Sequence, residues 1–220
     1  MAGPLCGFTV GITGHRRWEE QAEMLTRRGA QVTHGPVMHT TLLDDADATL
    51  DATRRALAGS IDAVVLTTGI GTRSWFAAAE SAGLDAELRI VGRRSTVVAR
   101  GPKARSAAIG AGLEVDWQAP NETSEEMVEH LERLGVRRRR VVVQRDGGDP
   151  IVAERLRSLG AEVVDVPVYR WHPPDDAAPG LRLLDAAAAG RVHALTFTCA
   201  YAVGNAFALA ADPAGLAAAL

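Results

Sequence analysis

The chain has 220 residues, of which 47% are hydrophobic and 23% charged, and its formal net charge is −3. This composition is typical of a globular protein with one large domain or two small ones, and it excludes a polycationic nucleic-acid binder. The two cysteines, Cys6 and Cys199, exclude a disulfide framework. No signal peptide and no apolar stretch of membrane-spanning length is present, which predicts a cytoplasmic location and no membrane partner.

Apolar runs rich in valine, isoleucine and leucine alternate with helical patterns along the whole chain. Near-continuous apolar runs are typical of parallel strands buried on both faces, so the alternation predicts an α/β fold with doubly wound parallel sheets. In chain order we expect strands at 8–13, 30–37, 62–68, 95–100, 113–117, 140–145, 161–169 and 193–198. We expect helices at 16–28, 44–58, 71–82, 102–112, 123–134, 149–159, 177–189 and 201–211.

Local signals mark several helix ends. The residues from Thr123 to Glu126 form a capping box, which predicts a helix start. Gly29, Gly112 and Gly160 follow helical runs at positions typical of C-terminal caps. The basic run VRRRR (136–140) leads directly into a β-like run, so a solvated loop is its expected structure.

An internal repeat relates the two ends of the chain. Shifted by 131 positions, DAVVLTTGIGTRSWFAAA (62–79) aligns with HALTFTCAYAVGNAFALA (193–210). The same shift places RRGAQVTHGPV (27–37) on SLGAEVVDVPV (158–168). The alignment favours a duplication, the alternative being generic strand–helix units that share a register by chance. The second copy stops at Leu220 before its last strands and helices, which favours a fragment of a longer protein over a naturally incomplete copy.

The linkers suggest how two similar α/β domains are divided. VMHTTLL (37–43) and VYRWHPP (168–174) occupy equivalent places in the repeat. If the chain crosses between domains at both points, one domain is discontinuous and comprises 1–38 plus 170–220, with its C-terminal part missing. The other domain, 39–169, is inserted into it.

Ligands of open parallel sheets bind beyond the carboxyl ends of the strands, against helix N-termini. The loops expected there contain hydroxyl groups, small residues and scattered arginine and lysine, which suits several anionic groups at once. No P-loop, complete G-x-G-x-x-G, G-x-S-x-G or metal-binding spacing is present, so the motifs give little support for a nucleotide or a metal. Gly69 and Gly71 are expected to form a plain tight turn. Candidate ligand contacts from these loops are Thr13, His15, Arg16, Arg100, Lys103 and Ser124.

Several candidates have a structural alternative. His15 fits a ligand contact or an ordinary exposed side chain. The two aspartates of QRDGGD (144–149) fit a helix cap better than an acid–base pair. Cys199 fits a small packing residue better than a nucleophile. Tyr169 lies where the chain leaves a strand for the linker, so it either faces an interdomain cleft or packs against Trp171.

Taken together, these residues resemble uroporphyrinogen-III synthase. The resemblance covers the whole chain and lies in LTTGIGTRSWF and FTCAYAV, in VVARGPKARSAAIGAGLEV, and in RVVVQRDGG followed by AERLRSLGAEVVDVPVYR. The TTGIG, ARGPKAR and VPVYRW variants resemble an actinobacterial type whose members often carry a C-terminal winged-helix, response-regulator-like DNA-binding domain. The resemblance therefore implies no nucleic-acid partner for this segment, and DNA as a partner only through a domain outside it.

The resemblance implies two α/β domains joined by a two-stranded linker around an interdomain cleft. It also implies a cofactor-free lyase of haem biosynthesis that acts on hydroxymethylbilane, a linear tetrapyrrole with eight carboxylates. Such enzymes eliminate water, close the macrocycle and invert its D ring through a spiro intermediate. Orientation of the flexible chain and preorganised dipoles would then supply most of the catalysis.

Family roles transfer to matching positions of this sequence. Tyr169 matches the tyrosine favoured as proton donor to the leaving hydroxyl, and Arg145 matches an arginine that could pair with carboxylates. The resemblance further implies that Thr67, Thr68 and Gly71 form a first substrate-binding turn, and Thr198 and Cys199 a second.

Two positions depart from the family pattern: Lys103 stands where threonine is common, and Cys199 where serine is common. A catalytically weak or silent tetrapyrrole-binding or sensing module of a transcriptional regulator is therefore the second hypothesis. A periplasmic-type binding fold is a third, against which the lack of an export signal argues.

Overall fold

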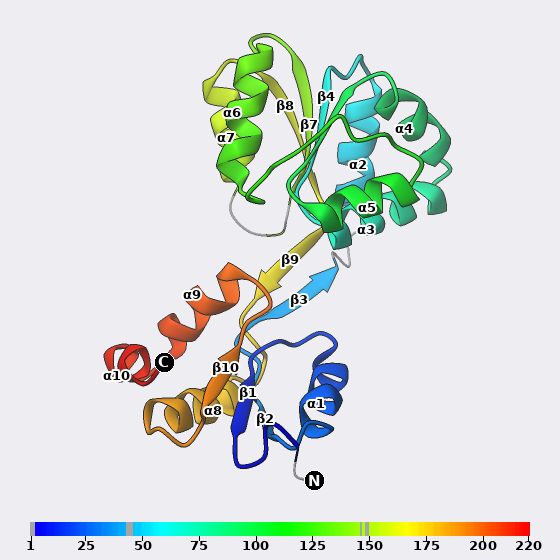
Figure 1. Cartoon of the computed structure of the whole chain (residues 1–220). Helices are drawn as coiled ribbons and strands as arrows, with labels where there is room; N and C mark the ends of the chain where they lie inside the picture. Colours follow the sequence, from blue (N-terminus) through cyan, green and yellow to red (C-terminus); the bar gives the residue numbers. More distant parts are fainter. Residues whose placement is uncertain (1–2, 43–45, 146, 148–149) are drawn as a thin grey trace. The chain divides into compact units, whose positions relative to one another are not determined.

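The computed structural model describes residues 3–42, 46–145, 147 and 150–220. Its tertiary contacts divide the chain into two compact units (Figure 1). We call Thr41–Arg170 the central unit, and the residues up to Thr40 together with Trp171–Leu220 the terminal unit.

The central unit is built on a five-stranded parallel sheet with the order β6-β5-β4-β7-β8. Its valine-rich strands are buried on both faces, as the sequence predicts, and all four residues of β4 are buried. The expected strand 161–169 is interrupted at Val168, and of the expected strand 113–117 only Trp117 lies in a strand. The strands are β4 (Ala63–Leu66), β5 (Thr96–Ala99), β6 (Trp117–Gln118), β7 (Arg140–Arg145) and β8 (Glu162–Pro167).

Helices cover both faces of this sheet (Figure 1). The chain passes from β4 to β5 and then to β6 in one direction along the sheet, and from β7 to β8 in the opposite direction. Because such crossover connections are right-handed, helices of connections that run in opposite directions lie on opposite faces of the sheet. One face carries α2 (Ala46–Leu57), α3 (Gly69–Ser81), α4 (Asp85–Gly92) and α5 (Pro102–Gly110). The other carries α6 (Ser124–Leu134) and α7 (Ile151–Ser158), whose apolar side chains pack on β4, β5 and β7.

The local helix signals are confirmed. Thr123 and Glu126 form the reciprocal capping bonds of α6. Gly29, Gly112 and Gly160 have φ values of 95°, 84° and 85°, which L-residues rarely adopt. The two aspartates expected to cap the helix near 149 lie outside the described residues.

Two helices are additional to those the sequence predicts. The segment after Gly83, a left-handed glycine with φ of 70° that ends α3, forms the short helix α4. Near the end of the chain, α10 (Pro213–Ala219) begins at an Asp212 cap whose side chain accepts a hydrogen bond from Gly215 N. Both helices are short, and helical periodicity over two turns gives little signal.

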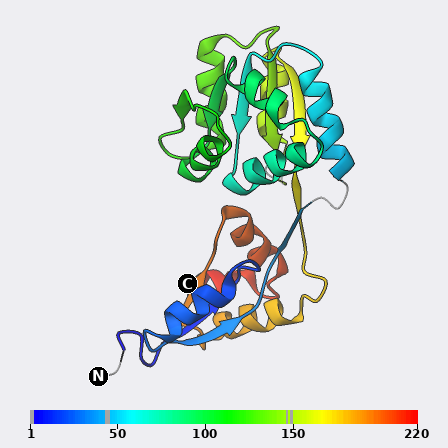
Figure 2. The same cartoon turned by 90° about the vertical axis from the view of Figure 1, so that its right-hand side faces the viewer.

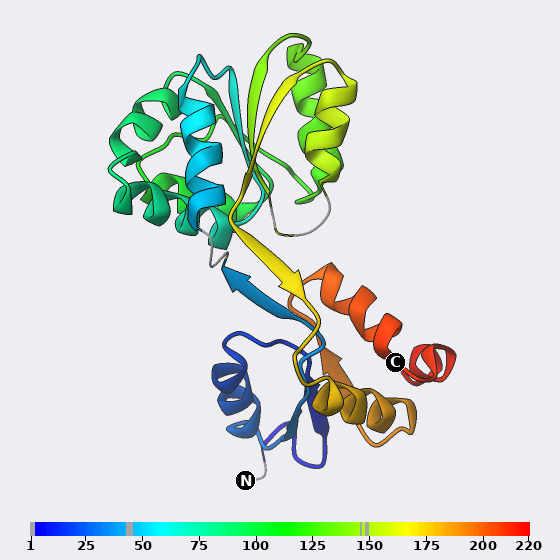
Figure 3. The same cartoon turned by 180° about the vertical axis from the view of Figure 1, so that it is seen from behind.

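The terminal unit contains a three-stranded parallel sheet with the order β10-β1-β2. Its helix α1 lies on one face and the other three helices lie on the opposite face (Figure 3). Its elements are β1 (Thr9–Ile12), α1 (Trp18–Thr26), β2 (Gln31–His34), α8 (Ala178–Ala188), β10 (Ala194–Thr196), α9 (Ala200–Leu209) and α10. The parallel α/β architecture predicted for both halves of the chain is thus confirmed.

The two sheets share one strand register. Ala63 is paired with Val141 in the central unit, and Ala194 with Val10 in the terminal unit, each residue being displaced by the 131 positions of the sequence repeat. The same displacement relates the pairing of β7 with β8 to that of β1 with β2. Equivalent sequence positions therefore occupy equivalent places in the two sheets.

The two linkers pair with each other. β3 (His39–Leu42) and β9 (Tyr169–His172) form a two-stranded sheet that contains both points where the chain passes between the units (Figure 2). The two-stranded linker implied by the family resemblance is therefore present.

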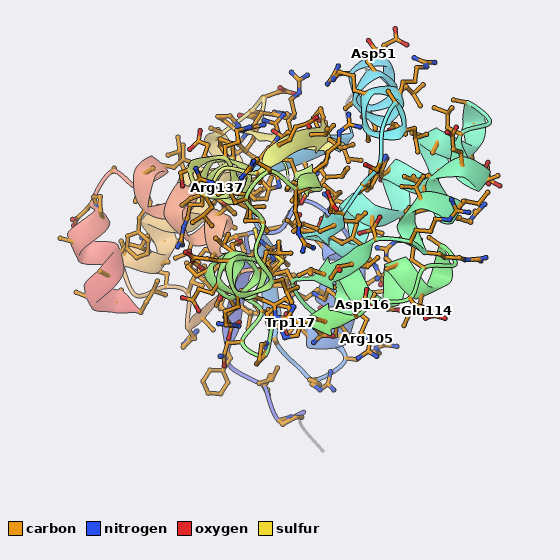
Figure 4. All side chains as sticks on the ribbon, turned by 90° about the horizontal axis from the view of Figure 1, so that it is seen from above. Asp51, Arg105, Glu114, Asp116, Trp117 and Arg137 are labelled. Atoms are coloured by element: carbon orange, nitrogen blue, oxygen red, sulfur yellow. The ribbon has the colours of Figure 1, made fainter. Side chains whose placement is uncertain are left out.

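The amino edge of the five-stranded sheet carries the basic run. Arg137 lies before β7, and Asp116 before β6 (Figure 4). Arg137, Arg138 and Arg139 are exposed, as the sequence predicts, whereas Arg140 opens β7 and its guanidinium donates to two carbonyls at the end of α2. None of the helices in the described part of the chain is long and apolar enough to span a bilayer.

Candidate functional site

The carboxyl ends of β4 and β7 form the topological switch point of the central sheet. These strands are neighbours, yet the chain leaves β4 toward β5 on one side and leaves β7 toward β8 on the other. The two connections diverge at the strand ends, which is where open α/β sheets bind their ligands. The residues that follow Leu66 and those at Gln144 therefore define the candidate site.

A threonine turn leads from β4 into α3. Thr68 is the extended N-cap residue, and its Oγ1 accepts a hydrogen bond from Gly71 N at 3.1 Å. The turn is tightly packed, because a Cβ at Gly71 would lie 2.5 Å from Cδ of Gln144 and 2.8 Å from Thr68 Oγ1. Gly69 and Gly71 are part of the first helical turn, so the expectation of a plain tight turn followed by a helix from 71 is wrong.

The side chain of Gln144 holds the backbone of this turn in place. Its side chain is fully buried, and Oε1 accepts hydrogen bonds from Thr67 N and Thr68 N, both at 3.2 Å. Its Nε2 donates to the Arg145 carbonyl at 2.6 Å, and Thr67 Oγ1 donates to the Gln144 carbonyl at 2.9 Å. The amide is thus satisfied on both sides, and it holds the threonine backbone at one position.

Tyr169 completes the site from the beginning of β9. Its ring is 4% exposed, and its hydroxyl lies 3.2 Å from Thr68 Oγ1, at hydrogen-bonding distance. Gly147, with φ of 84°, passes so close to this ring that a Cβ there would lie 2.6 Å from Cδ2. We call Thr68 and Tyr169 the hydroxyl pair.

Arg145 points away from the hydroxyl pair. Side chains alternate along a strand, and Arg145 shares the parity of Val141 and Val143, which face α6 and α7. It forms an ion pair with Asp165 at 3.5 Å. Burial raises the pKa of the Asp165 carboxyl, while Arg145 and Arg157 oppose that rise.

The remaining predicted residues of the central unit lie at the same carboxyl edge. Arg100 follows β5 and is half-buried, and its backbone N–H donates to Leu66 O at 2.9 Å. Lys103 is exposed in the first turn of α5, and its backbone packs against Gly69. Ser124 is the half-buried first residue of α6.

The other predicted residues belong to the carboxyl edge of the terminal sheet. Thr13 is fully buried, and its hydroxyl donates to Thr196 O at 2.6 Å, so it serves the strand pairing. His15 and Arg16 are exposed in the loop after β1, and Thr198 and Cys199 are exposed after β10.

The repeat gives the hydroxyl pair a counterpart of different chemistry. Displaced by 131 positions, Thr68 and Tyr169 correspond to Cys199 and Met38, whose sulfur atoms lie 3.9 Å apart. The same contact is therefore made by two proton-bearing hydroxyls in one unit and by a thiol and a thioether in the other. A hydroxyl pair can donate protons to oxygen acceptors, whereas a thiol is a weak donor and a thioether none.

The sequence pattern assigned no role to Gln144 or Gly147. The only local signal for Gln144 was a polar residue that directly follows the buried valines of β7. Gly147 carried no signal, because the tyrosine that it contacts is far away in the sequence.

The chain is similar to known proteins in both sequence and structure. Residues 19–219 match the family model described as "Uroporphyrinogen-III synthase HemD". A crystal structure of mutant uroporphyrinogen III synthase from the extremely thermophilic bacterium Thermus thermophilus is 29% identical, with a TM-score of 0.82 over 97% of this chain and 81% of that one. Another crystal form of that enzyme gives 0.70 at 28% identity, over the same shares of the two chains. The uncharacterized protein YjjA of Bacillus subtilis (strain 168) is 28% identical over 208 residues, 94% of this chain and 76% of that protein.

Proposed function

Because the chain belongs to the uroporphyrinogen-III synthase family, we propose that it converts hydroxymethylbilane into uroporphyrinogen III. The observation that carries this proposal is the hydroxyl pair of Thr68 and Tyr169 at the switch point of the central sheet. It supplies a proton donor on a rigid turn, and Gln144 fixes that turn from below.

The reaction requires a proton at the leaving group and control over a flexible chain. Protonation of the hydroxymethyl oxygen releases water, and the electron-deficient carbon is then attacked by a pyrrole carbon of the D ring. The spiro intermediate reopens and closes with the D ring inverted, and loss of a ring proton balances the proton donated at the start. In this scheme Tyr169 donates the first proton, either directly or through Thr68.

Two physical effects account for the rate. A positioned proton donor contributes typically 10²–10⁴-fold. Orientation of the linear chain contributes up to about 7–11 kcal/mol, because closure replaces a search over many conformers. Backbone N–H groups at the helix N-termini along the carboxyl edge suit the substrate's carboxylates.

The test uses hydroxymethylbilane generated enzymatically and supplied to the purified protein. Products are oxidised to porphyrins, and isomers I and III are separated by chromatography. Isomer III should dominate with the wild-type protein. Tyr169→Phe and Thr68→Val should each lower its rate of formation by about 100-fold, whereas Tyr201→Phe, which alters the other tyrosine of the chain, should not.

The binding-module hypothesis retains one specific observation. Lys103 is exposed at the start of α5, where the family resemblance leads one to expect a neutral hydroxyl. A protein that binds tetrapyrroles but yields only isomer I, the product of spontaneous closure, would favour that hypothesis and reject the enzyme.

A further inference from the structure

Three histidines from separate segments meet within the terminal unit. His15 follows β1, His39 opens β3 and His172 ends β9. The rings of His15 and His39 stack with centroids 3.9 Å apart, and the ring of His172 meets that of His39 edge-on at 5.6 Å. We call these three residues the histidine cluster.

The cluster lies where the terminal sheet would bind a ligand. His15 lies in the loop that follows the carboxyl end of β1, and its neighbour Gly14 approaches Thr198, which follows β10. The loop is held in place, because His34 Nε2 lies 2.9 Å from Gly14 O and Trp18 stacks on His34 at 4.0 Å. The neighbouring histidine thus supports the loop that presents His15.

The cluster is not arranged as a metal site. The planes of the stacked His15 and His39 rings lie 30° apart, and the ring of His172 stands at 80° to that of His39. Within the described residues, no group of three or more His, Cys, Asp and Glu side chains could hold a metal ion. Its chemistry is therefore that of imidazoles, which carry a positive charge only when protonated.

In the free protein His39 resists protonation. Burial lowers the pKa of His39, and the charges of His15, His172 and, more weakly, His34 lower it further, while Asp175 opposes them. Two stacked imidazolium rings would repel each other. In the absence of an anion, His39 therefore takes up a proton less readily than a free imidazole.

We infer that the histidine cluster is a proton-linked subsite for a carboxylate group of the bound tetrapyrrole. The identity of this ligand rests on the proposed function, whereas the subsite itself rests on the ring contacts and their place at the sheet edge. An arriving carboxylate offsets the repulsion between the rings, so the cluster takes up a proton as the ligand binds. Exposed His15 gives the ligand access, and His39 gains the charge.

The linkage has a defined sign. Binding raises the affinity of the cluster for protons, so ligand affinity must rise as pH falls through the histidine range. One proton taken up gives about tenfold tighter binding per pH unit. The ligand's own carboxylates stay ionised there, because free carboxyl groups titrate near pH 4.

The experiment measures binding of uroporphyrin III, an unreactive octacarboxylate macrocycle, by fluorescence between about pH 8 and about pH 6. Calorimetry in buffers of different ionisation enthalpy counts the protons taken up. Affinity should rise about tenfold per pH unit, with about one proton absorbed. His39→Gln should flatten the pH dependence of the affinity and weaken binding about tenfold at about pH 6. His15→Gln should change the affinity in the same direction, and because His15 is exposed its replacement carries no folding risk.

His130→Gln is the matched control. His130 is also a half-buried histidine stacked on an aromatic ring, that of Trp117 at 4.2 Å, and burial lowers its pKa too. Its replacement should leave the pH dependence of binding unchanged. Equal effects of the His39 and His130 variants would overturn the inference, as would absent or pH-independent binding of uroporphyrin by the wild-type protein.

The two proposals can fail separately. Isomer III formation with pH-independent binding would keep the enzyme and reject the subsite. Proton-linked binding that needs His39, together with isomer I alone, would keep the subsite and reject the enzyme.

Discussion

Gln144→Met removes the amide that holds the threonine turn and keeps the size of the side chain. Thr67 N and Thr68 N, each 3.2 Å from the oxygen of the fully buried Gln144 side chain, lose their acceptor. An unsatisfied buried donor costs about 1–3 kcal/mol, and two donors are affected. Removal of the buried amide itself offsets part of this cost. The free energy of unfolding of the central unit should therefore fall by about 3 kcal/mol.

Amide hydrogen exchange reports this loss at the affected atoms. About 3 kcal/mol corresponds to exchange about 100-fold faster at the N–H groups of Thr67 and Thr68. Gln31→Met, at an exposed position of β2, is the control and should change stability by less than about 0.5 kcal/mol. Unchanged exchange at both threonines, with a stability loss below about 1 kcal/mol, would refute the assigned role of Gln144.

Gln144→Glu tests the direction of the second hydrogen bond. A carboxylate oxygen would replace Nε2, which now donates to the Arg145 carbonyl at 2.6 Å, so two acceptors would face each other. Protonation restores a donor, and burial raises the pKa of such a carboxyl. This variant should therefore lose stability progressively as pH rises above the ordinary glutamate value of about 4.3, and a flat pH profile would contradict the geometry.

Three further predictions concern other contacts. Gly147→Ala should destabilise the protein and lower the rate of isomer III formation, because its Cβ would clash with the Tyr169 ring. Gly135→Ala, at a glycine with φ of 79° and open space around the Cβ, controls for backbone strain alone, and equal denaturation midpoints of the two variants would count against the clash. Because the pKa of Asp165 is raised in the folded state, its carboxyl ionises more readily in the unfolded chain, and the wild-type protein should lose stability as pH rises above the ordinary aspartate pKa of 3.8. Asp165→Asn should abolish this loss. Urea titrations at several pH values measure it, and an unchanged dependence of stability on pH in the variant would contradict the burial argument. Thr123→Ala should lower the free energy of unfolding by about 1 kcal/mol through loss of the α6 cap, and no change in urea midpoint would show that the capping box contributes nothing.

The sequence alone supplied the architecture because its signals are local. Continuous valine runs indicated buried parallel strands, and the capping box at Thr123 located the start of α6. The offset of 131 positions found in the sequence repeat also relates the strand registers of the two sheets. Short elements such as α4, and the glycine start of α3, were missed or misplaced because few residues carry their periodicity.

Only the tertiary structure showed which side chains meet. Thr68 and Tyr169 lie 101 positions apart, and nothing in their spacing distinguishes a hydroxyl pair from two unrelated residues. The order of the parallel strands places the end of β4 beside that of β7, so Gln144 reaches a turn 76 residues away. Likewise, only the tertiary structure brings His15, His39 and His172 together from three separate segments. Local propensity determines the elements, but the contacts that make a site depend on the sheet order, which local pattern does not encode.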